Sequence, residues 1–358
     1  MLKFRIALLL FGFCSGLLLV EILLNVLGLP RSYEPRSTPP QFQFHIPQNG
    51  DFFYTNTPST KIDFVYDGNP RGYFEEGNIV SHKTNSLGFR GDEFTIPKSS
   101  QLVRITALGD SFTFGEGVKD GDTYAEKLEA LLQDQGDDAL EFEVYNFGVG
   151  GFNTEQAVRL FEDLVIQVNP DHLVLGYTLN DAEPKLFLLD QATQEIRRRE
   201  RSVEAIESIY ALKQSGGFLS RFKTVQLIQQ ILNKEKMTRG TVEYYKALYE
   251  EKNADWSKTQ ASFKRLSELC QQREIECTVL IFPLLYDLSE DYPFIAIHEK
   301  IRKEAEMNGL NVVDLFPALK GMDHTSLWVH PTDQHPNEIV HQIAADALFQ
   351  SIFRNTEF

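Results

Sequence analysis

The chain has 358 residues, of which 42% are apolar and 24% charged, and its formal net charge is −16. This composition is ordinary for a globular protein, and the length suffices for one large domain or two small ones. The negative charge argues against a nucleic-acid partner, because phosphate binding needs a basic surface.

The chain begins with a long apolar segment. Residues 6–29 are almost wholly apolar, with Glu21 and Asn25 as the strongly polar exceptions. About 20 apolar residues suffice to cross the hydrocarbon core of a bilayer. A carboxyl group such as that of Glu21 is costly there unless it reaches the interface or is protonated. The pattern predicts a transmembrane helix.

The flanks of this segment favour an uncleaved signal anchor. A cleaved signal peptide needs small residues at a cleavage site, and residues 20–35 show no A-x-A pattern. Lys3 and Arg5 precede the apolar run, and positive charge there orients the N-terminus to the cytoplasm. We therefore expect a cytoplasmic tip and membrane anchor over residues 1–30, with the rest of the chain on the periplasmic or extracellular side.

Residues 31–100 are predicted to be a linker and an accessory segment. Residues 31–60 are rich in Pro, Ser, Thr, Gln and Asn, which is typical of a linker. Residues 61–97 alternate aromatic side chains with Gly and Asn, which indicates short strands and turns.

From residue 101 to 358 strands alternate with helices. The predicted strands are Val103 to Leu108, Glu141 to Phe147, His172 to Tyr177, Thr278 to Phe282 and Asn311 to Leu315. The predicted helices are Thr123 to Gln135, Thr154 to Val168, Trp256 to Gln272, Ile295 to Met307 and Glu338 to Phe353. Such alternation predicts an α/β fold, a three-layer α/β/α sandwich around a central parallel sheet.

Residues 184–252 interrupt this alternation. They are polar, charged and mostly helical in pattern, with Gly216 and Gly217 as a breaker. An insertion at this end of a sheet either covers the site as a lid or forms a solvated helical excursion. The sequence leaves both open.

The chain has three cysteines, too few for a disulfide framework. Cys270 and Cys277 stand seven residues apart, at a predicted helix end and in the next strand. They pair if they lie outside the cytoplasm, or they are two ordinary buried thiols.

Ligands of open parallel sheets bind beyond the carboxyl ends of the strands. The first such end carries Gly109-Asp110-Ser111, where a serine hydroxyl is placed at the sheet edge. The nucleophile elbow G-x-S-x-G is absent, because Thr113 occupies its last position. Ser111 is thus a candidate nucleophile outside the α/β-hydrolase family.

The next two strand ends carry candidate oxyanion donors. The second is followed by a glycine-rich turn containing Gly151, and glycine lets a backbone N–H approach a ligand closely. The third is followed by Asn180, whose side-chain amide can donate to a developing oxyanion. A flexible turn and an Asx-type cap are the plainer interpretations.

A candidate base precedes the last helix. Pro336 fits the first position of that helix, so His335 is expected at its cap with its ring facing the sheet edge. Asp333 can bond the second ring nitrogen and set the tautomer, as a catalytic triad requires. His330 is the rival, but no aspartate precedes it closely.

These blocks, in this order, resemble the SGNH (GDSL) hydrolase superfamily over roughly residues 84–350. The resemblance implies the flavodoxin-like SGNH fold and matches Ser111 to the nucleophile, Gly151 and Asn180 to the oxyanion hole, and His335 to the base. Asp333 matches the acid, although the spacing here is Asp-x-His where many members have Asp-x-x-His. Asn85 to Gly91 also look like the lead-in of membrane-anchored bacterial members.

The resemblance implies an esterase that removes an acyl group, such as O-acetyl, from an ester substrate. An O-acetylated glycan of the cell envelope is a candidate substrate, because the chain is expected outside the membrane. An O-acyltransferase with the same residues and a non-catalytic glycan-binding scaffold are the alternatives. The mechanism requires no cofactor or metal, and its site would be Ser111, His335, Asp333, Gly151 and Asn180.

Overall fold

The computed structural model describes residues 2–31, 33–37, 42–45, 53–95, 97–135, 140–190, 193, 195–201 and 218–353. The chain forms two compact units. One comprises Met1–Tyr33 and Glu200–Tyr245, and the other comprises Glu34–Arg199 and Lys246–Phe358.

The larger unit is built on a five-stranded parallel sheet with strand order β11-β10-β7-β5-β6. Its strands are β5 (Leu102–Gly109), β6 (Glu141–Gly148), β7 (His172–Tyr177), β10 (Glu276–Ile281) and β11 (Asn311–Asp314). Numbered along the chain, this is the flavodoxin-like order 2-1-3-4-5, whose topological switch point lies between the first and third strands. That point falls between β5 and β7.

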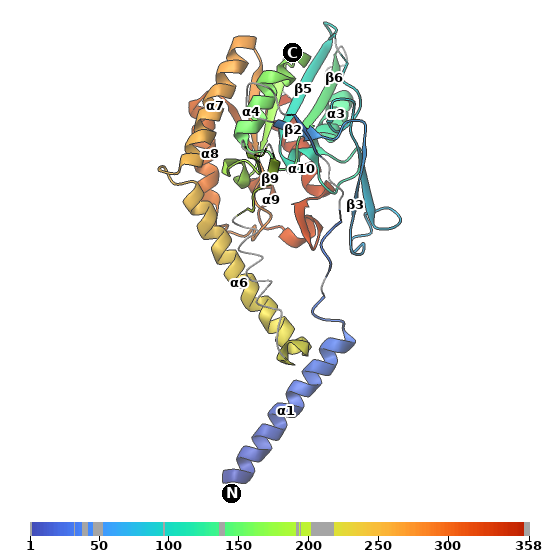
Figure 1. The fold of residues 1–358 in the computed structure, drawn as a ribbon, viewed down its shortest axis with the longest axis vertical. Coiled ribbons are helices and arrows are strands. Elements are labelled where there is room, and N and C mark those ends of the chain that lie inside the picture. The colour runs from blue at the N-terminus through green and yellow to red at the C-terminus, as the bar shows by residue number, and fades with distance from the viewer. Residues whose placement is uncertain are drawn as a thin grey trace. The chain divides into compact units, whose positions relative to one another are not determined.

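Helices cover both faces of the sheet (Figure 1). On one face α4 (Thr154–Asp163) packs on α7 (Ala254–Arg273), which contacts α8 (Ile295–Met307). On the other, α3 (Tyr124–Gln135) packs against α10 (Glu338–Leu348). The predicted three-layer α/β sandwich is confirmed.

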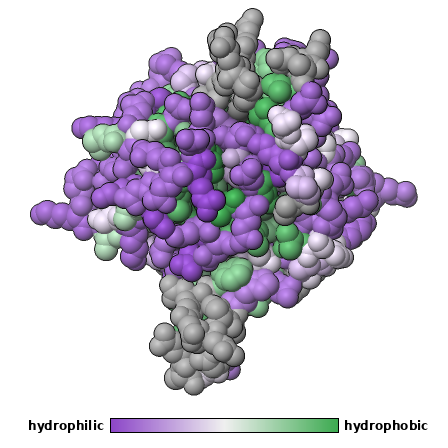
Figure 2. Space-filling view, turned by 90° about the horizontal axis from the view of Figure 1, so that it is seen from above, coloured by the Kyte–Doolittle hydropathy of each residue, from purple (hydrophilic) through white to green (hydrophobic). Residues whose placement is uncertain are grey.

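Burial on both faces of the sheet explains why its strands could be predicted from the sequence. Every residue of β5 and β7 is buried, so these strands are near-continuous apolar runs. Figure 2 shows one outer face, where hydrophilic side chains prevail and hydrophobic ones surface in small areas between them.

Short elements complete the larger unit. They are β1 (Phe42–His45), β2 (Phe53–Asn56), β3 (Lys61–Val65), β4 (Ile79–Lys83), α2 (Ser111–Phe114), η1 (Val165–Val168), η2 (Leu179–Ala182), α9 (Phe316–Leu319), η4 (His324–Leu327), β12 (Trp328–His330), β13 (Asp333–Pro336) and η5 (Phe349–Phe353). The predicted helix over 154–168 is broken at Leu164, where α4 gives way to η1.

The accessory segment packs directly against the elements that carry the site. The β3–β4 hairpin contributes Ile62, Phe64 and Val80 to a buried cluster that also contains Phe114 of α2 and Val329 of β12. The strands and turns predicted over residues 61–97 are therefore present, and they belong to the same compact unit as the sheet.

The insertion differs in part from its predicted helical character. It begins with a β-hairpin of β8 (Phe187–Asp190) and β9 (Glu195–Arg198). Residues 202–217, which include the predicted breaker at Gly216 and Gly217, lie outside the described residues. Further on, η3 (Phe218–Arg221) precedes the long helix α6 (Lys223–Leu248). Ring contacts of Phe187 with Phe42 and Tyr54 hold the hairpin against β1 and β2, which explains its extended conformation.

The smaller unit contains α1 (Leu2–Val26) and most of α6. Within the described part of the chain, α1 is the one helix long and apolar enough to cross a membrane, and its apolar window is not buried.

Cys270 and Cys277 form a disulfide between the end of α7 and β10. The structure thus decides between the two alternatives that the sequence left open.

Candidate active site

Ser111 begins the short helix α2 directly after β5, at the switch point of the sheet. Asp110 caps this helix, because its carboxylate accepts a hydrogen bond of 2.9 Å from the backbone N–H of Phe112. The first N–H groups of a helix have no partner within it. The N–H of Ser111 is one of these, so its geometry suits an oxyanion donor.

His335 reaches Ser111 from the β12–β13 hairpin. Its Nε2 lies 2.9 Å from Oγ of Ser111, and its ring packs edge-on against Phe112. The predicted position of His335 at a helix cap is wrong. Pro336 ends strand β13, Asn337 is the N-cap, and α10 begins at Glu338. Pro336 suits both settings, because a residue at a strand end need not donate a ladder hydrogen bond.

Asp333 lies on the far side of the imidazole. Its Oδ1 is 2.5 Å from Nδ1 of His335, and its Oδ2 accepts a hydrogen bond of 2.9 Å from the hydroxyl of Tyr66. Asp333 is therefore within reach of the ring nitrogen opposite the serine, which is the arrangement that orients a catalytic histidine.

The charges around His335 favour its protonated form. Burial lowers the pKa of the imidazole, but the carboxylates of Asp333 and Glu116 outweigh burial and raise it above its usual value. Burial raises the pKa of Asp333, but His335 and Arg36 outweigh it and hold that pKa well below its usual range. Asp333 therefore stays ionised near neutral pH.

Gly151 lies in the loop after β6 with φ at +78°, a conformation that L side chains rarely adopt. A Cβ atom there would lie 2.4 Å from Cδ2 of Leu186. The end of β6, which leads into this loop, is tied to the nucleophile turn, because the amide of Asn146 donates to the carbonyl of Thr113 at 2.8 Å. A glycine is therefore needed where the predicted oxyanion donor stands.

Asn180 lies on η2, just beyond β7. Its Nδ2 donates to Oδ2 of Asp110 at 2.9 Å, and its Oδ1 accepts a hydrogen bond from the hydroxyl of Thr178. An amide nitrogen has two hydrogens. One is used by Asp110 and the other remains to donate to a ligand. No role was predicted for Asp110 from the sequence, although it lies within the Gly-Asp-Ser triplet.

Two further charged residues border the triad, and sequence reasoning missed both. Arg36 forms an ion pair with Glu116, and its Nη1 lies 3.1 Å from Oδ2 of Asp333. Oε2 of Glu116 is 3.8 Å from Nε2 of His335. Glu116 lies five residues after Ser111, which is a weak signal, but Arg36 lies in the predicted linker and no motif marks it.

His330, the rival base, has a different environment. It is buried on β12, with Nδ1 2.9 Å from the hydroxyl of Thr332 and Nε2 3.1 Å from the carbonyl of Asp67. Both ring nitrogens therefore have partners, one within the hairpin and one in the accessory segment.

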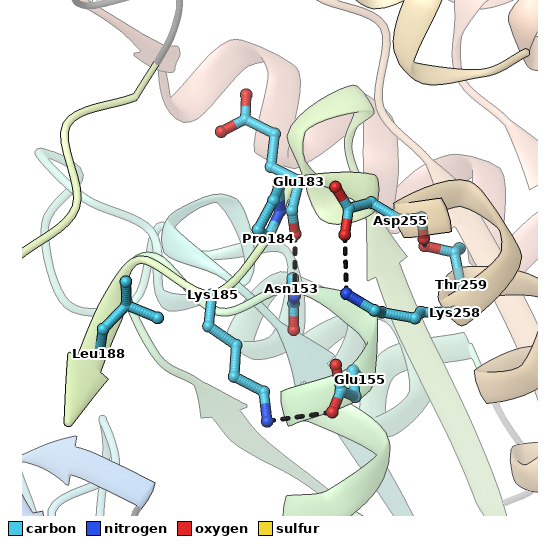
Figure 3. A pocket seen from close by; sticks show the side chains of 9 residues that line it. All are labelled: Asn153, Glu155, Glu183, Pro184, Lys185, Leu188, Asp255, Lys258 and Thr259. Atoms are coloured by element: carbon cyan, nitrogen blue, oxygen red, sulfur yellow. Dashed lines mark hydrogen bonds and ion pairs between the residues drawn. The ribbon is translucent and has the colours of Figure 1, made fainter. Parts of the chain in front are cut away.

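A cavity of about 270 Å³ lies beside the loop that carries Gly151 (Figure 3). It is lined by Asn153, Glu155, Glu183, Pro184, Lys185, Leu188, Asp255, Lys258 and Thr259. Lys185 pairs with Glu155 at 3.0 Å and Lys258 with Asp255 at 2.8 Å, so the lining is rich in charged hydrogen-bonding groups. None of the triad residues lines it. The described residues contain no cluster of three metal-ligating side chains.

At the carboxyl edge of the parallel sheet, a serine, a histidine and an aspartate are hydrogen-bonded in succession. This is the arrangement of a serine hydrolase. The model of the GDSL-like lipase/acylhydrolase family matches residues 107–343. The chain belongs to this family, and it is a hydrolase that acts on ester bonds.

Some solved structures resemble this chain at low sequence identity. A lipolytic protein of the G-D-S-L family from Desulfitobacterium hafniense DCB-2 is 14% identical with a TM-score of 0.40, covering 69% of this chain and 98% of its own. A catalytic mutant of Axe2, an acetylxylan esterase from Geobacillus stearothermophilus, is 17% identical with a TM-score of 0.43, covering 74% and 98%. A search of the curated proteins found no match.

Proposed function

We propose that the chain is a membrane-anchored serine esterase that removes acyl groups, O-acetyl in particular, with Ser111 as nucleophile, His335 as base and Asp333 as acid. The observation that carries this proposal is the distance of 2.9 Å between Nε2 of His335 and Oγ of Ser111, with Asp333 on the opposite ring nitrogen. This geometry satisfies the hydrogen-bond reach that nucleophile activation needs.

In the acylation step, His335 takes the proton of the Ser111 hydroxyl while Oγ attacks the ester carbonyl. The C=O π electrons move to the oxygen, and the resulting tetrahedral oxyanion collapses with cleavage of the bond to the alcohol. His335 then gives its proton to the departing alcohol oxygen. General acid–base help of this kind contributes roughly 10²- to 10⁴-fold to the rate.

The oxyanion would be held by the N–H groups of Ser111 and Gly151 and by Nδ2 of Asn180. Their placement around the end of β5 supports this assignment, as does the orientation of the Asn180 amide by Asp110. Each donor of this kind is typically worth about 3 kcal/mol in the transition state. Water, activated by His335, then releases the acyl group from Ser111.

The alcohol part of the substrate is proposed to be a glycan. The cavity lined by Lys185 and Lys258 supports this, because these lysines and the carboxylates paired with them offer donors and acceptors to hydroxyl groups. If a sugar hydroxyl replaces water in the second step, the same residues act as an O-acyltransferase. Product analysis separates the two, because a hydrolase releases free acetate without an acceptor sugar.

The apolar helix α1 is proposed to anchor the chain in a membrane, with the catalytic unit on the outer side. Lys3 and Arg5 at its start support this orientation. The disulfide between Cys270 and Cys277 also supports it, because disulfides persist in oxidising compartments and are rare in the cytosol.

The test uses p-nitrophenyl acetate and a fluorophosphonate probe. Ser111→Ala and His335→Ala should each abolish turnover, and Ser111→Ala should also abolish labelling. Ser257→Ala, at an exposed position of α7, should leave both unchanged. Full activity of Ser111→Ala would refute the nucleophile, and loss of activity in His330→Ala with full activity in His335→Ala would show that the base is misassigned.

A further inference from the structure

Within the smaller unit, the carboxylate of Glu21 in α1 contacts the start of α6. One carboxylate oxygen accepts a hydrogen bond from the backbone N–H of Lys223 at 2.6 Å. The other accepts from the N–H and the hydroxyl of Thr224, at 2.9 and 2.7 Å. Glu21 therefore caps a helix that begins about 200 residues later in the chain.

This contact explains how a carboxylate is tolerated in the apolar segment. A charged group in an apolar environment is costly unless it is paired and hydrogen-bonded. The first N–H groups of a helix lack partners within it, and the helix dipole favours negative charge at that end. Near the C-terminal end of α1, the carboxylate of Glu21 and the first N–H groups of α6 thus supply each other's hydrogen-bond partners.

The part of α6 that follows this contact carries exposed apolar side chains. Ile228, Ile231 and Leu232 are 51% to 59% exposed and stand at i, i+3 and i+4, so they form one stripe along the helix. Leu219, just before the helix, is 64% exposed. Glu235, seven residues after Ile228, falls on the same face and ends the stripe.

We propose that residues 219–232 enter the surface of the lipid bilayer beside α1, so that the start of α6 is a second membrane contact. This rests on the proposed membrane anchor. Lipid is proposed to cover this stripe because Glu21 joins the start of α6 to the membrane-anchoring helix α1. Next to Glu21, the side chains of Leu18 and Ile22 in α1 are themselves exposed and apolar. Arg221 and Lys223 stand beside the stripe, where basic side chains meet anionic headgroups.

The experiment places an environment-sensitive fluorophore at single cysteines of the full-length chain. Cys14→Ser removes the one free thiol, and the disulfide does not react with the dye. The probe is attached at Ile231→Cys, at Glu235→Cys as the control on the same face, and at Leu10→Cys as the reference within α1. Each protein is reconstituted in phosphatidylcholine–phosphatidylglycerol vesicles with or without doxyl-labelled lipid.

Lipid quenching at positions 10 and 231, with at least threefold less at 235, is the expected result. Quenching at position 10 with none at 231 would overturn the second contact and leave the anchor standing. Absence of quenching at position 10 would overturn the anchor and this inference with it. A blue-shifted but unquenched probe at 231 that reverts on dilution of the protein among vesicles would assign the stripe to a second copy of the chain instead.

The role of Glu21 is tested in the same assay. Glu21→Ala removes the cap and should at least halve the quenching at position 231 while that at position 10 is unchanged. Asn25→Ala, which removes a neighbouring side chain that also bonds Glu21, is the matched control and should change neither. Equal quenching at position 231 in Glu21→Ala would refute the role of the cap.

Discussion

Arg36 is expected to set the pH at which the site becomes active. In the proposed mechanism, His335 acts as a base only when its imidazole is neutral. Asp333 and Glu116 raise the pKa of His335, whereas Arg36 lowers it. Arg36→Met removes the charge but keeps an unbranched apolar stem over the ring of Phe64, against which the guanidinium lies at 4.7 Å. The variant should therefore need a higher pH for activity.

The size of this effect follows from the distances. Arg36 bonds Glu116, whose Oε2 is 3.8 Å from Nε2 of His335. At roughly 6 Å and an effective dielectric constant of about 20, Coulomb's law gives ~3 kcal/mol, or ~2 pKa units. The side chain of His335 is 22% exposed, and screening by solvent and salt at this exposure reduces the effect to about one unit. Asp333 remains ionised, because its own pKa starts well below the usual range.

The assay is the pH profile of kcat/KM with p-nitrophenyl acetate, whose acid limb reports the base of the free enzyme. The acid limb of Arg36→Met should move up by about one pH unit. Arg71→Met is the matched control, because Arg71 is equally exposed, pairs with Glu338 and lies over Tyr73. Its profile should not move. Arg36→Met/Glu116→Gln should reverse much of the shift, because Glu116 raises the pKa of His335. An unmoved acid limb in Arg36→Met would refute the electrostatic reasoning.

Four further changes follow from the contacts described. Gly151→Ala should lower kcat by roughly 10²- to 10³-fold, because the new methyl group collides with Leu186 and displaces the proposed oxyanion donor. Steady-state kinetics and the melting temperature check this prediction, and an unchanged kcat would exclude the N–H of Gly151 from the oxyanion hole. Asp110→Ala should lower kcat at least ~10-fold by releasing the Asn180 amide, and Asn180→Ala should then add little, as a double-mutant cycle would show. Cys270→Ser/Cys277→Ser should destabilise the fold by about 2 kcal/mol in urea titrations; an unchanged midpoint would contradict this. Lys185→Ala should raise KM for an acetylated oligosaccharide but not for p-nitrophenyl acetate, and equal effects on both would remove the cavity from the glycan proposal.

The strands and helices of the sandwich could be predicted because each one has a simple burial pattern. The fully buried residues of β5 and β7 read as apolar runs, and the helices read as one-sided stripes. Pro336 was wrongly placed at the first position of the last helix, because the preference of proline for that position competed with a hairpin contact that joins Trp328 to Pro336. Such pairing depends on where one strand folds back onto the other, which the local sequence does not determine.

The contacts of Arg36 could not be predicted from the sequence, for a related reason. The backbone of the next residue, Ser37, pairs with Val65, and this bridge brings Arg36 toward residues 80 and 297 positions away in the chain, Glu116 and Asp333. No periodicity or motif encodes a contact of that separation. The positions of Ser111 and Asn180 could be predicted because both residues follow directly on strands whose carboxyl ends meet at one edge of the sheet.

The spacing of Asp333 and His335 follows from the element that carries them. In a helix, side chains three or four positions apart share a face, whereas in a strand alternate side chains do. Here both residues lie on β13, so a separation of two directs both side chains to the same side of the strand and places Oδ1 of Asp333 on Nδ1 of His335. The Asp-x-His spacing is thus the geometry that a strand requires, and inserting one residue between them should break the contact by turning Asp333 to the opposite face.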